Sequence, residues 1–253
     1  MSGRSGRFST TDRGVSDVVG YVLVFSLIVA TVGVVTVAGF GTIDDRQAAE
    51  RINNVERAFD VFAANVETVY RDDAPSRATE MRLAGGSLGV GEPVVITVAD
   101  ADDPTVNVTA SPRPLIYEDG DTEIVYTAGA MLRSEGDSSV MLHEPPFRTD
   151  TPTASFPIVD TFQSSGVTSV STDGTIRVRS TARGVNTTTP SSFDTSGTYT
   201  VTVESRRSDA WARYFESQSS VTVLEHEADR VVAEVSTDGV AAPRFPVRLR
   251  FSR

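Results

Sequence analysis

Residues 18–43 read VVGYVLVFSLIVATVGVVTVAGFGTI, and none of these 26 positions carries a charged side chain. As a helix this stretch would be about 39 Å long at ~1.5 Å per residue, which exceeds the ~30 Å hydrocarbon core of a bilayer. A helix inside a soluble domain is seldom apolar on every side over such a length. The stretch therefore predicts a single membrane-spanning helix.

The charges on either side of this stretch predict its orientation. Arginines outnumber acids before residue 18, whereas Asp44 and Asp45 follow directly after residue 43. Because positive flanking charges stay in the cytoplasm, the N-terminus is expected there and the 210 residues after position 43 are expected outside. We therefore predict a single-pass protein of the cell membrane with an extracellular C-terminal domain.

A cleavable signal peptide is the main alternative for the same stretch. Small residues around Ala38 and Gly39 would suit a signal peptidase, although the apolar core of a signal peptide usually spans only ~7–15 residues. In both cases the rest of the chain is exported.

The segment just before the apolar stretch resembles a known family. Residues 13–20, RGVSDVVG, with the long apolar helix behind them, are similar to the N-terminus of haloarchaeal type IV pilins and pilin-like proteins. The resemblance implies that a prepilin peptidase cuts after Gly14, so that residues 1–14 form a leader and Val15 becomes the mature N-terminus. It also implies that the uncut helix packs against other pilin-like subunits.

Two positions depart from the pattern of that family. Asp17 stands where many archaeal pilins have Pro, and Val19 stands at the fifth mature position, where bacterial type IV pilins carry an acid. An acid near the start of a helix complements its macrodipole, so Asp17 is expected to serve a related purpose two positions earlier.

The next segment has the pattern of an amphipathic helix. No Pro or Gly interrupts residues 44–73, and the chain breaks at Ala74-Pro75. We predict one helix over residues 15–73, membrane-spanning and then amphipathic; a separate helix docked on the following domain is the alternative. Apolar residues recur here at steps of three and four: Ile52, Val55, Phe59, Phe62, Val66, Val69 and Tyr70.

Residues 74–253 change to short alternating or β-branched runs separated by Gly, Asp, Ser and Pro, which predicts an extracellular β domain. The fold class expected is α+β, with a mainly antiparallel sandwich or rolled sheet after the long helix. Gly85-Gly86 is interpreted as a hairpin turn. Residues 208–217 predict a short helix capped by Ser208 or Asp209. The expected strands are 79–83, 93–98, 105–110, 115–117, 123–128, 140–143, 156–159, 175–180, 199–205, 221–224, 230–236 and 247–251.

A second, less specific resemblance lies in the middle of this domain. Residues 129–136, GAMLRSEG, with Met141-Leu142 and Pro145-Pro146-Phe147, are similar to an uncharacterised group of haloarchaeal pilin-like proteins. This resemblance supports the architecture and implies no chemistry.

The composition indicates adaptation to salt. All 23 basic residues are Arg, with no Lys, against 34 acids. An acidic surface keeps a protein hydrated and self-repelling in strong salt, which favours a halophilic archaeal origin, while a GC-rich genome is the alternative reason for the missing Lys. The acidity argues against a nucleic-acid partner, and the pair Arg206-Arg207 is too small to change that. The lack of Cys excludes disulfides and thiolate sites.

No stretch of the chain has the spacing of a catalytic, cofactor or metal site. His143 and His226 are each followed by Glu, but they stand 83 positions apart and are expected at ordinary surface positions. The acids at 100, 102 and 103 lack EF-hand spacing and predict a solvated loop. Residues 85–91 are Gly-rich without the Lys of a phosphate loop. Two sequons, at Asn107 and Asn186, are candidate glycosylation sites, and Asn186 lies in a Thr/Ser-rich stretch.

These observations favour a pilin-like structural or adhesive subunit, anchored at the cell surface by its N-terminal helix. The partners expected are the membrane, a prepilin peptidase and other pilin-like subunits. A non-assembling, membrane-anchored envelope protein with a binding ectodomain is the alternative. No enzymatic activity and no cofactor are expected.

The charge balance predicts that the exported part depends on salt. Residues 44–253 carry 20 Arg and 32 acids. At low ionic strength the Debye length grows to ~30 Å and the carboxylates repel one another, whereas molar salt shortens it to ~3 Å. The melting temperature of this part should therefore rise between about 0.05 M and about 2 M KCl. An equal melting temperature at both concentrations would leave codon bias as the reason for the missing Lys.

Overall fold

The computed structural model of the protein describes residues 11–72, 74–150, 152–163, 166, 168–185, 193 and 195–252, with the backbone alone at 11–17 and 36–47. The chain forms two compact units, Met1–Glu50 and Arg51–Arg253. Each unit is described separately below.

The first unit is dominated by helix α1, which runs from Thr11 to Arg71 and continues into the second unit. Its segment Val18–Val35 has a mean hydropathy of 2.6, and none of it is buried. By length and composition it is a candidate membrane span or signal segment. One helix covers both segments predicted from the sequence, so the expectation of a single long helix is confirmed.

The last part of α1 belongs to the core of the second unit. Its apolar face is buried, and Phe59 and Phe62 are completely inaccessible to solvent. The Phe62 and Tyr126 rings form a T-shaped pair with a centroid distance of 5.1 Å. Burial of one such aromatic side chain contributes about 1.5–3 kcal/mol, so this face holds the helix firmly in the domain.

The strands of the described chain form four sheets, and most neighbours are antiparallel, as predicted. The parallel pairs are β10 with β17 and β9 with β16. The four-stranded sheet has the order β1 (Ser76–Arg82), β12 (Thr175–Ala182), β17 (Arg244–Ser252), β10 (Ile158–Phe162). The six-stranded sheet has the order β11 (Ser169–Ser171), β2 (Ser87–Val90), β5 (Leu115–Asp119), β6 (Thr122–Thr127), β7 (Ala130–Glu135), β8 (Ser138–His143). The five-stranded sheet has the order β14 (Val221–Glu227), β15 (Arg230–Thr237), β13 (Gly197–Glu204), β3 (Val95–Asp100), β4 (Asn107–Ala110), and the two-stranded sheet pairs β16 (Gly239–Ala241) with β9 (Thr153–Ser155).

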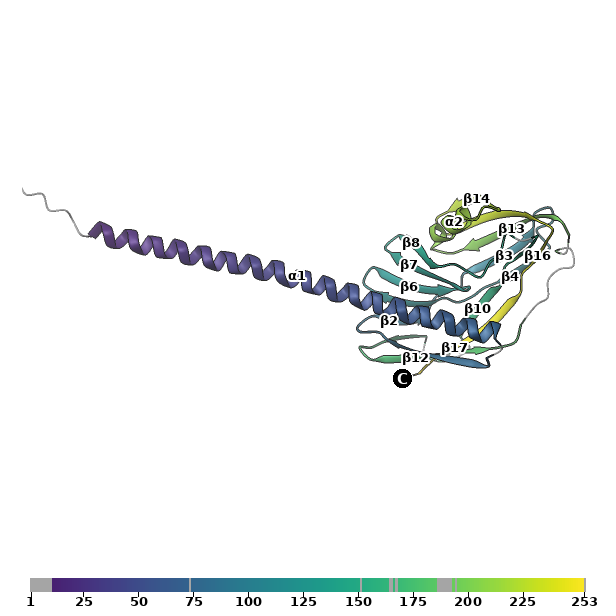
Figure 1. Ribbon diagram of the computed structural model, residues 1–253, viewed down its shortest axis with the longest axis horizontal. Helices are drawn as coiled ribbons and strands as arrows, with labels where there is room; N and C mark the ends of the chain where they lie inside the picture. Colours follow the sequence, from purple (N-terminus) through teal and green to yellow (C-terminus); the bar gives the residue numbers. More distant parts are fainter. Residues whose placement is uncertain are drawn as a thin grey trace, which may run out of the picture. The chain divides into compact units, whose positions relative to one another are not determined.

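The six-stranded sheet is covered on both faces. Along β6, Val125 enters one core with the five-stranded sheet and helix α2 (Ser208–Ser217), while Ile124 and Tyr126 enter a second core. The second core is completed by α1 and the four-stranded sheet. In Figure 1, α1 lies between the six-stranded sheet and the four-stranded sheet. Because alternate residues of a strand point to opposite faces, the part of a strand that is buried on both sides is a continuous apolar run. This accounts for the runs LIY in β5, IVY in β6 and AML in β7.

The structure corrects two local expectations. Gly85-Gly86 does not form a hairpin, because β1 pairs with β12 while β2 pairs with β5. A Cβ on Gly86 would lie 2.4 Å from the Tyr117 ring, so this position requires Gly for close packing. Helix α2 has the predicted bounds, but its N-cap is Arg207, without a side-chain cap hydrogen bond. The Ser208 hydroxyl instead donates to the carbonyls of Glu227 and Ala228.

Candidate functional site

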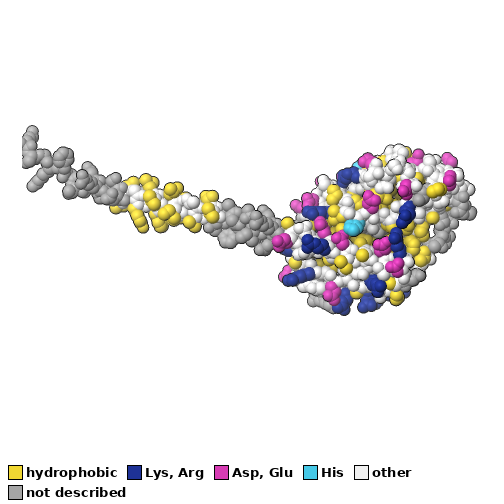
Figure 2. Space-filling model, viewed as in Figure 1, with side chains coloured by type: hydrophobic (Ala, Val, Ile, Leu, Met, Phe, Trp, Pro, Cys, Tyr) yellow, Lys and Arg dark blue, Asp and Glu magenta, His cyan; other side chains and the backbone are white. Residues whose placement is uncertain are grey.

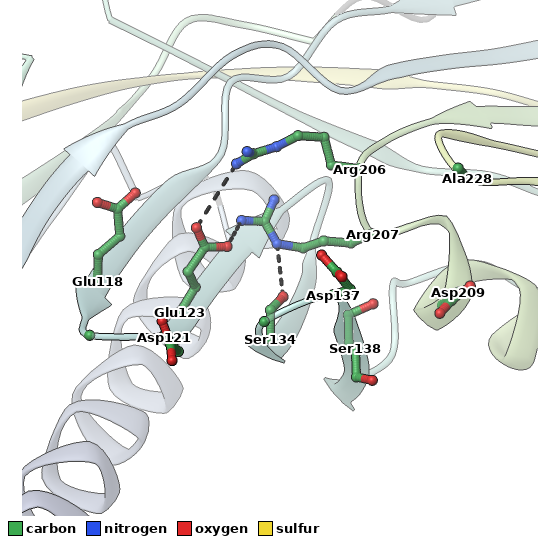
Figure 3. Close-up of a pocket in the computed structure, with 13 residues that line it drawn as sticks. Glu118, Asp121, Glu123, Ser134, Asp137, Ser138, Arg206, Arg207, Asp209 and Ala228 are labelled. Carbon is green, nitrogen blue, oxygen red and sulfur yellow. Dashed lines mark hydrogen bonds and ion pairs between the residues drawn. The ribbon is translucent and has the colours of Figure 1, made fainter.

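A groove of about 650 Å³ opens at the ends of the β5–β6 and β7–β8 hairpins, beside the start of α2 (Figure 3). The hairpin turns, the segment before α2 and the β14–β15 turn bring its walls together. We call it the Arg207 groove. It is lined by Glu118, Gly120, Asp121, Glu123, Ser134, Gly136, Asp137, Ser138, Ser139, Arg206, Arg207, Asp209 and Ala228.

The Arg207 side chain is the structural centre of the groove. It is only 7% exposed, its Nε donates to the Ser134 hydroxyl at 3.1 Å, and its Nη2 donates to a Glu123 carboxylate oxygen. Figure 3 shows both arginine side chains reaching toward Glu123. A charge taken out of water is tolerated only when an opposite charge and hydrogen bonds replace its hydration. Through Glu123 on β6 and Ser134 on β7, Arg207 therefore connects the segment before α2 to these two strands.

The neighbouring Arg206 behaves differently. Its side chain is 78% exposed and its Nη2 lies 3.9 Å from the other Glu123 carboxylate oxygen. At this exposure an ion pair contributes little, about 0–1 kcal/mol. Arg206 is therefore available to a ligand in the groove, whereas Arg207 serves the fold.

Acids outnumber arginines along the lining. Asp121 and Asp137 are exposed, and within the described chain neither has an ion pair, whereas Asp209 pairs with His226 at 3.0 Å. The described residues contain no group of three or more side chains suited to hold a metal ion. The lining offers carboxylates, hydroxyls and guanidinium groups, so its chemistry is that of a polar binding surface.

The two histidines weighed as a site have separate partners. His143 Nε2 on β8 lies 2.9 Å from Asp60 of α1, and His226 Nε2 on β14 lies 3.0 Å from Asp209 of α2. The two side chains belong to different sheets. Each histidine thus joins a strand to a helix of the same unit.

The acidic loop between β3 and β4 uses its carboxylates internally. One oxygen of Asp100 accepts hydrogen bonds from the backbone N–H groups of Asp102 and Asp103. One oxygen of Asp103 accepts from the N–H and the hydroxyl of Thr105. These bonds fix a turn, in agreement with the interpretation as a solvated loop.

The structure describes one of the two candidate glycosylation sites. Asn107 is exposed at the start of β4, an edge strand, and its amide donates to the carbonyl of Pro104 at 3.0 Å. Thr109 donates its hydroxyl to the Asn107 carbonyl oxygen. Asn186 lies outside the described residues.

The predicted processing position falls within helix α1. The backbone at Gly14 and Val15 is helical, since α1 begins at Thr11. Residues 1–10 of the predicted leader lie outside the described chain.

Sequence reasoning did not find the Arg207 groove. It noted Arg206-Arg207 only as too small a basic cluster for nucleic acid. The position of this pair directly before a helix was visible, but its partner Glu123 lies 84 positions away. Only the pairing of β6 with β7 brings Glu123 and Ser134 together to receive the guanidinium.

Replacement of Arg207 by Met should destabilise the second unit by about 3 kcal/mol, because Glu123 loses its buried partner and keeps only the exposed Arg206 at 3.9 Å. Arg206→Met is the matched control and should cost less than about 1 kcal/mol. The double variant Arg207→Met/Glu123→Leu should recover most of the loss. Denaturant unfolding measures all three, and equal effects of the two single substitutions would contradict the assigned roles.

No curated protein and no solved structure matches this chain. A family described as a family of unknown function, DUF7289, matches residues 13–250, which is nearly the whole chain. The match includes the apolar helix and every sheet described above. The protein therefore belongs to the DUF7289 family.

Proposed function

We propose that the protein is a pilin-like structural or adhesive subunit, held at the surface of a halophilic archaeal cell by its N-terminal helix. The observation that carries this proposal is the unburied apolar segment Val18–Val35 of α1. Its Leu, Ile and Phe side chains, such as Leu23, Phe25 and Ile28, are more than half exposed. Each contributes about 1.5–3 kcal/mol when it is covered, so a bilayer or neighbouring helices must surround this segment.

Helix α1 has an unburied apolar segment and a second segment that is buried in the domain core, and this combination supports a subunit rather than a plain anchor. A helix that only anchors a domain needs to span the membrane and can end at its surface. Here the same helix enters the core of the β domain through Phe59 and Phe62. In such a subunit one continuous helix links the apolar segment to the core of the domain, which suits a filament subunit.

The proposal includes an orientation and partners. The N-terminus lies in the cytoplasm and the second unit lies outside, where Asn107 and Asn186 are the candidate glycosylation sites. A prepilin peptidase removes residues 1–14, and the helix then meets the membrane and other pilin-like subunits. The role is structural and not enzymatic.

The Arg207 groove favours a second candidate function. A polar groove of about 650 Å³ with an exposed Arg206 suits a ligand-binding ectodomain on a protein that stays singly anchored. In that case the helix would span the membrane without joining a filament.

N-terminal sequencing of protein from the membrane and from sheared surface filaments tests the proposal. Both fractions should begin at Val15. A start near Phe40 would show signal-peptide cleavage, and an intact Met1 would show a plain signal anchor; either result ends the pilin-like account. Val15 in the membrane fraction without any filament fraction would favour the ligand-binding candidate.

A pair of variants sharpens this test. Gly33→Asp places a charge in the apolar segment, where it costs about 2.5–3.5 kcal/mol in a membrane, and should remove the filament fraction. Val61→Asp places the same charge on an exposed position of α1 in the second unit and should leave filaments intact. Filaments that persist with Gly33→Asp would contradict a helical filament core.

A further inference from the structure

The four-stranded sheet carries a basic surface on a protein that is acidic as a whole. In β12 and β17 alternate side chains enter the core beneath α1, so the side chains between them point outward. Figure 2 shows arginine side chains along the lower edge of the domain, where Figure 1 labels β12 and β17. We call this surface the arginine face. Its members are Arg177, Arg179, Arg183, Arg248 and Arg250.

The strand register places these like charges next to one another. Arg179 lies directly opposite Arg250, and Arg248 lies opposite Thr181. The backbone N–H of Arg183 donates to the carbonyl of Pro246, and this bond keeps Arg183 beside β17. The pKa of Arg248 is lowered by burial and by the charges of Arg183 and Arg250. Like charges directly opposite on a sheet destabilise it, so this arrangement acts against the fold.

The chain neutralises only part of this surface, and Arg244 at the start of β17 pairs with Asp160 at 2.9 Å. Arg177 pairs with Glu80 at 2.7 Å. Among the described residues, Arg179, Arg183, Arg248 and Arg250 have no ion pair, although the sequence contains more acids than arginines. The Nε of Arg248 is buried without a hydrogen-bond partner. Guanidinium groups without an internal partner can bind an external carboxylate or phosphate in a two-pronged geometry.

A complementary surface exists on the same chain. Five acids and two arginines line the Arg207 groove, and Asp121 and Asp137 on its rim are exposed and unpaired within the described chain. The groove lies at the hairpin ends beside α2, whereas the arginine face lies on the four-stranded sheet, on the other side of the domain in Figure 1. One copy therefore cannot join its own two surfaces, but two copies can.

We propose that the arginine face of one copy binds the acidic rim of the Arg207 groove of a second copy. Because two different surfaces meet, the contact is heterologous, and each copy keeps one free surface of each kind. Such contacts propagate into rings or open chains rather than stopping at a dimer. The proposal rests on the assembling subunit proposed above and assigns it a contact between β domains. In molar salt only close charge pairs remain effective, and directly contacting guanidinium and carboxylate groups meet that condition.

The lack of Lys allows a direct test on the full chain in detergent. A zero-length carbodiimide joins an amine to a carboxylate in contact with it, and the wild-type chain has no side-chain amine. Arg250→Lys keeps the charge of the arginine face and adds one reactive amine. This variant should give covalent dimers in molar KCl, joined at Asp121 or Asp137 as shown by mass spectrometry. Arg148→Lys, at an exposed arginine outside this sheet, is the matched control and should stay at the wild-type level.

Removal of the acceptors provides the second measurement. Arg250→Lys combined with Asp121→Asn and Asp137→Asn should give about tenfold less dimer, the scale expected when an interface loses close charge pairs. Dimers joined elsewhere, or equal yields from the lysine variant and its control, would overturn the proposal. So would dimers that form only when anionic lipid is added, which would assign the arginine face to a membrane surface.

Charge reversal separates this contact from a general loss of folding. Arg179→Glu/Arg250→Glu sets acids against the acidic rim, and Asp121→Arg/Asp137→Arg sets arginines against the arginine face. In each variant like charges meet at the contact, so neither should self-associate. An equimolar mixture should associate, which unfolded variants cannot do, and a mixture that stays monomeric would overturn the proposal. Filaments whose subunits begin at Val15 but give no such cross-link would refute the contact and leave the pilin-like function standing. Cross-linked chains that retain Met1 would support the contact and refute the pilin-like function.

Discussion

The fold depends on the burial of both faces of one sheet. In the six-stranded sheet, neighbouring residues of the same strand enter two different cores, so neither face can be left uncovered. One face is covered by the five-stranded sheet and α2, and the other by α1 with the four-stranded sheet. The helix is therefore a required part of the β domain. Its contacts through Phe59, Phe62 and Val66 occupy space that no strand fills.

The covering of both faces of the six-stranded sheet also determines where charged side chains are located. The hairpin ends of the six-stranded sheet converge with the start of α2, and there Arg207 is held by Glu123 and Ser134. The four-stranded sheet has only one apolar face to contribute to the core, so its other face is free to carry charge. The result is an acidic groove and a basic sheet surface on one domain.

Local patterns in the sequence were enough to predict both helices and most strands of the described chain. The three- and four-residue spacing from Ile52 to Tyr70 predicted the helix, and each of the twelve expected strands overlaps a strand of the structure. The bounds of α2 were correct because SDAWARYFES interrupts the alternation around it. Strands β2, β7, β9, β11 and β16 were missed. In β7, AMLRSE is buried on both faces and shows no regular alternation, and β9, β11 and β16 have only three residues each.

Features that depend on distant pairing could not be predicted. Gly85-Gly86 has the composition of a hairpin turn, but β1 and β2 join different sheets. The alternating arginines of β12 and β17 were visible in the sequence, yet their juxtaposition depends on a pairing that joins Arg179 to Arg250. Burial of Arg207 likewise follows from the packing of α2 on a sheet far away in the sequence. In each case the missing information was which strands are neighbours.

The most direct measurement compares the unfolding of residues 51–253 with that of residues 74–253. The longer piece retains the buried face of α1 without the apolar segment, and it should unfold cooperatively in molar salt without detergent. Loss of six buried apolar side chains, at about 1.5–3 kcal/mol each, removes roughly 9–18 kcal/mol, which matches or exceeds the ~5–15 kcal/mol stability of a typical domain. The shorter piece should therefore show no cooperative transition and should expose apolar surface. Equal unfolding free energies for the two pieces would contradict the claim that the helix is part of the domain core.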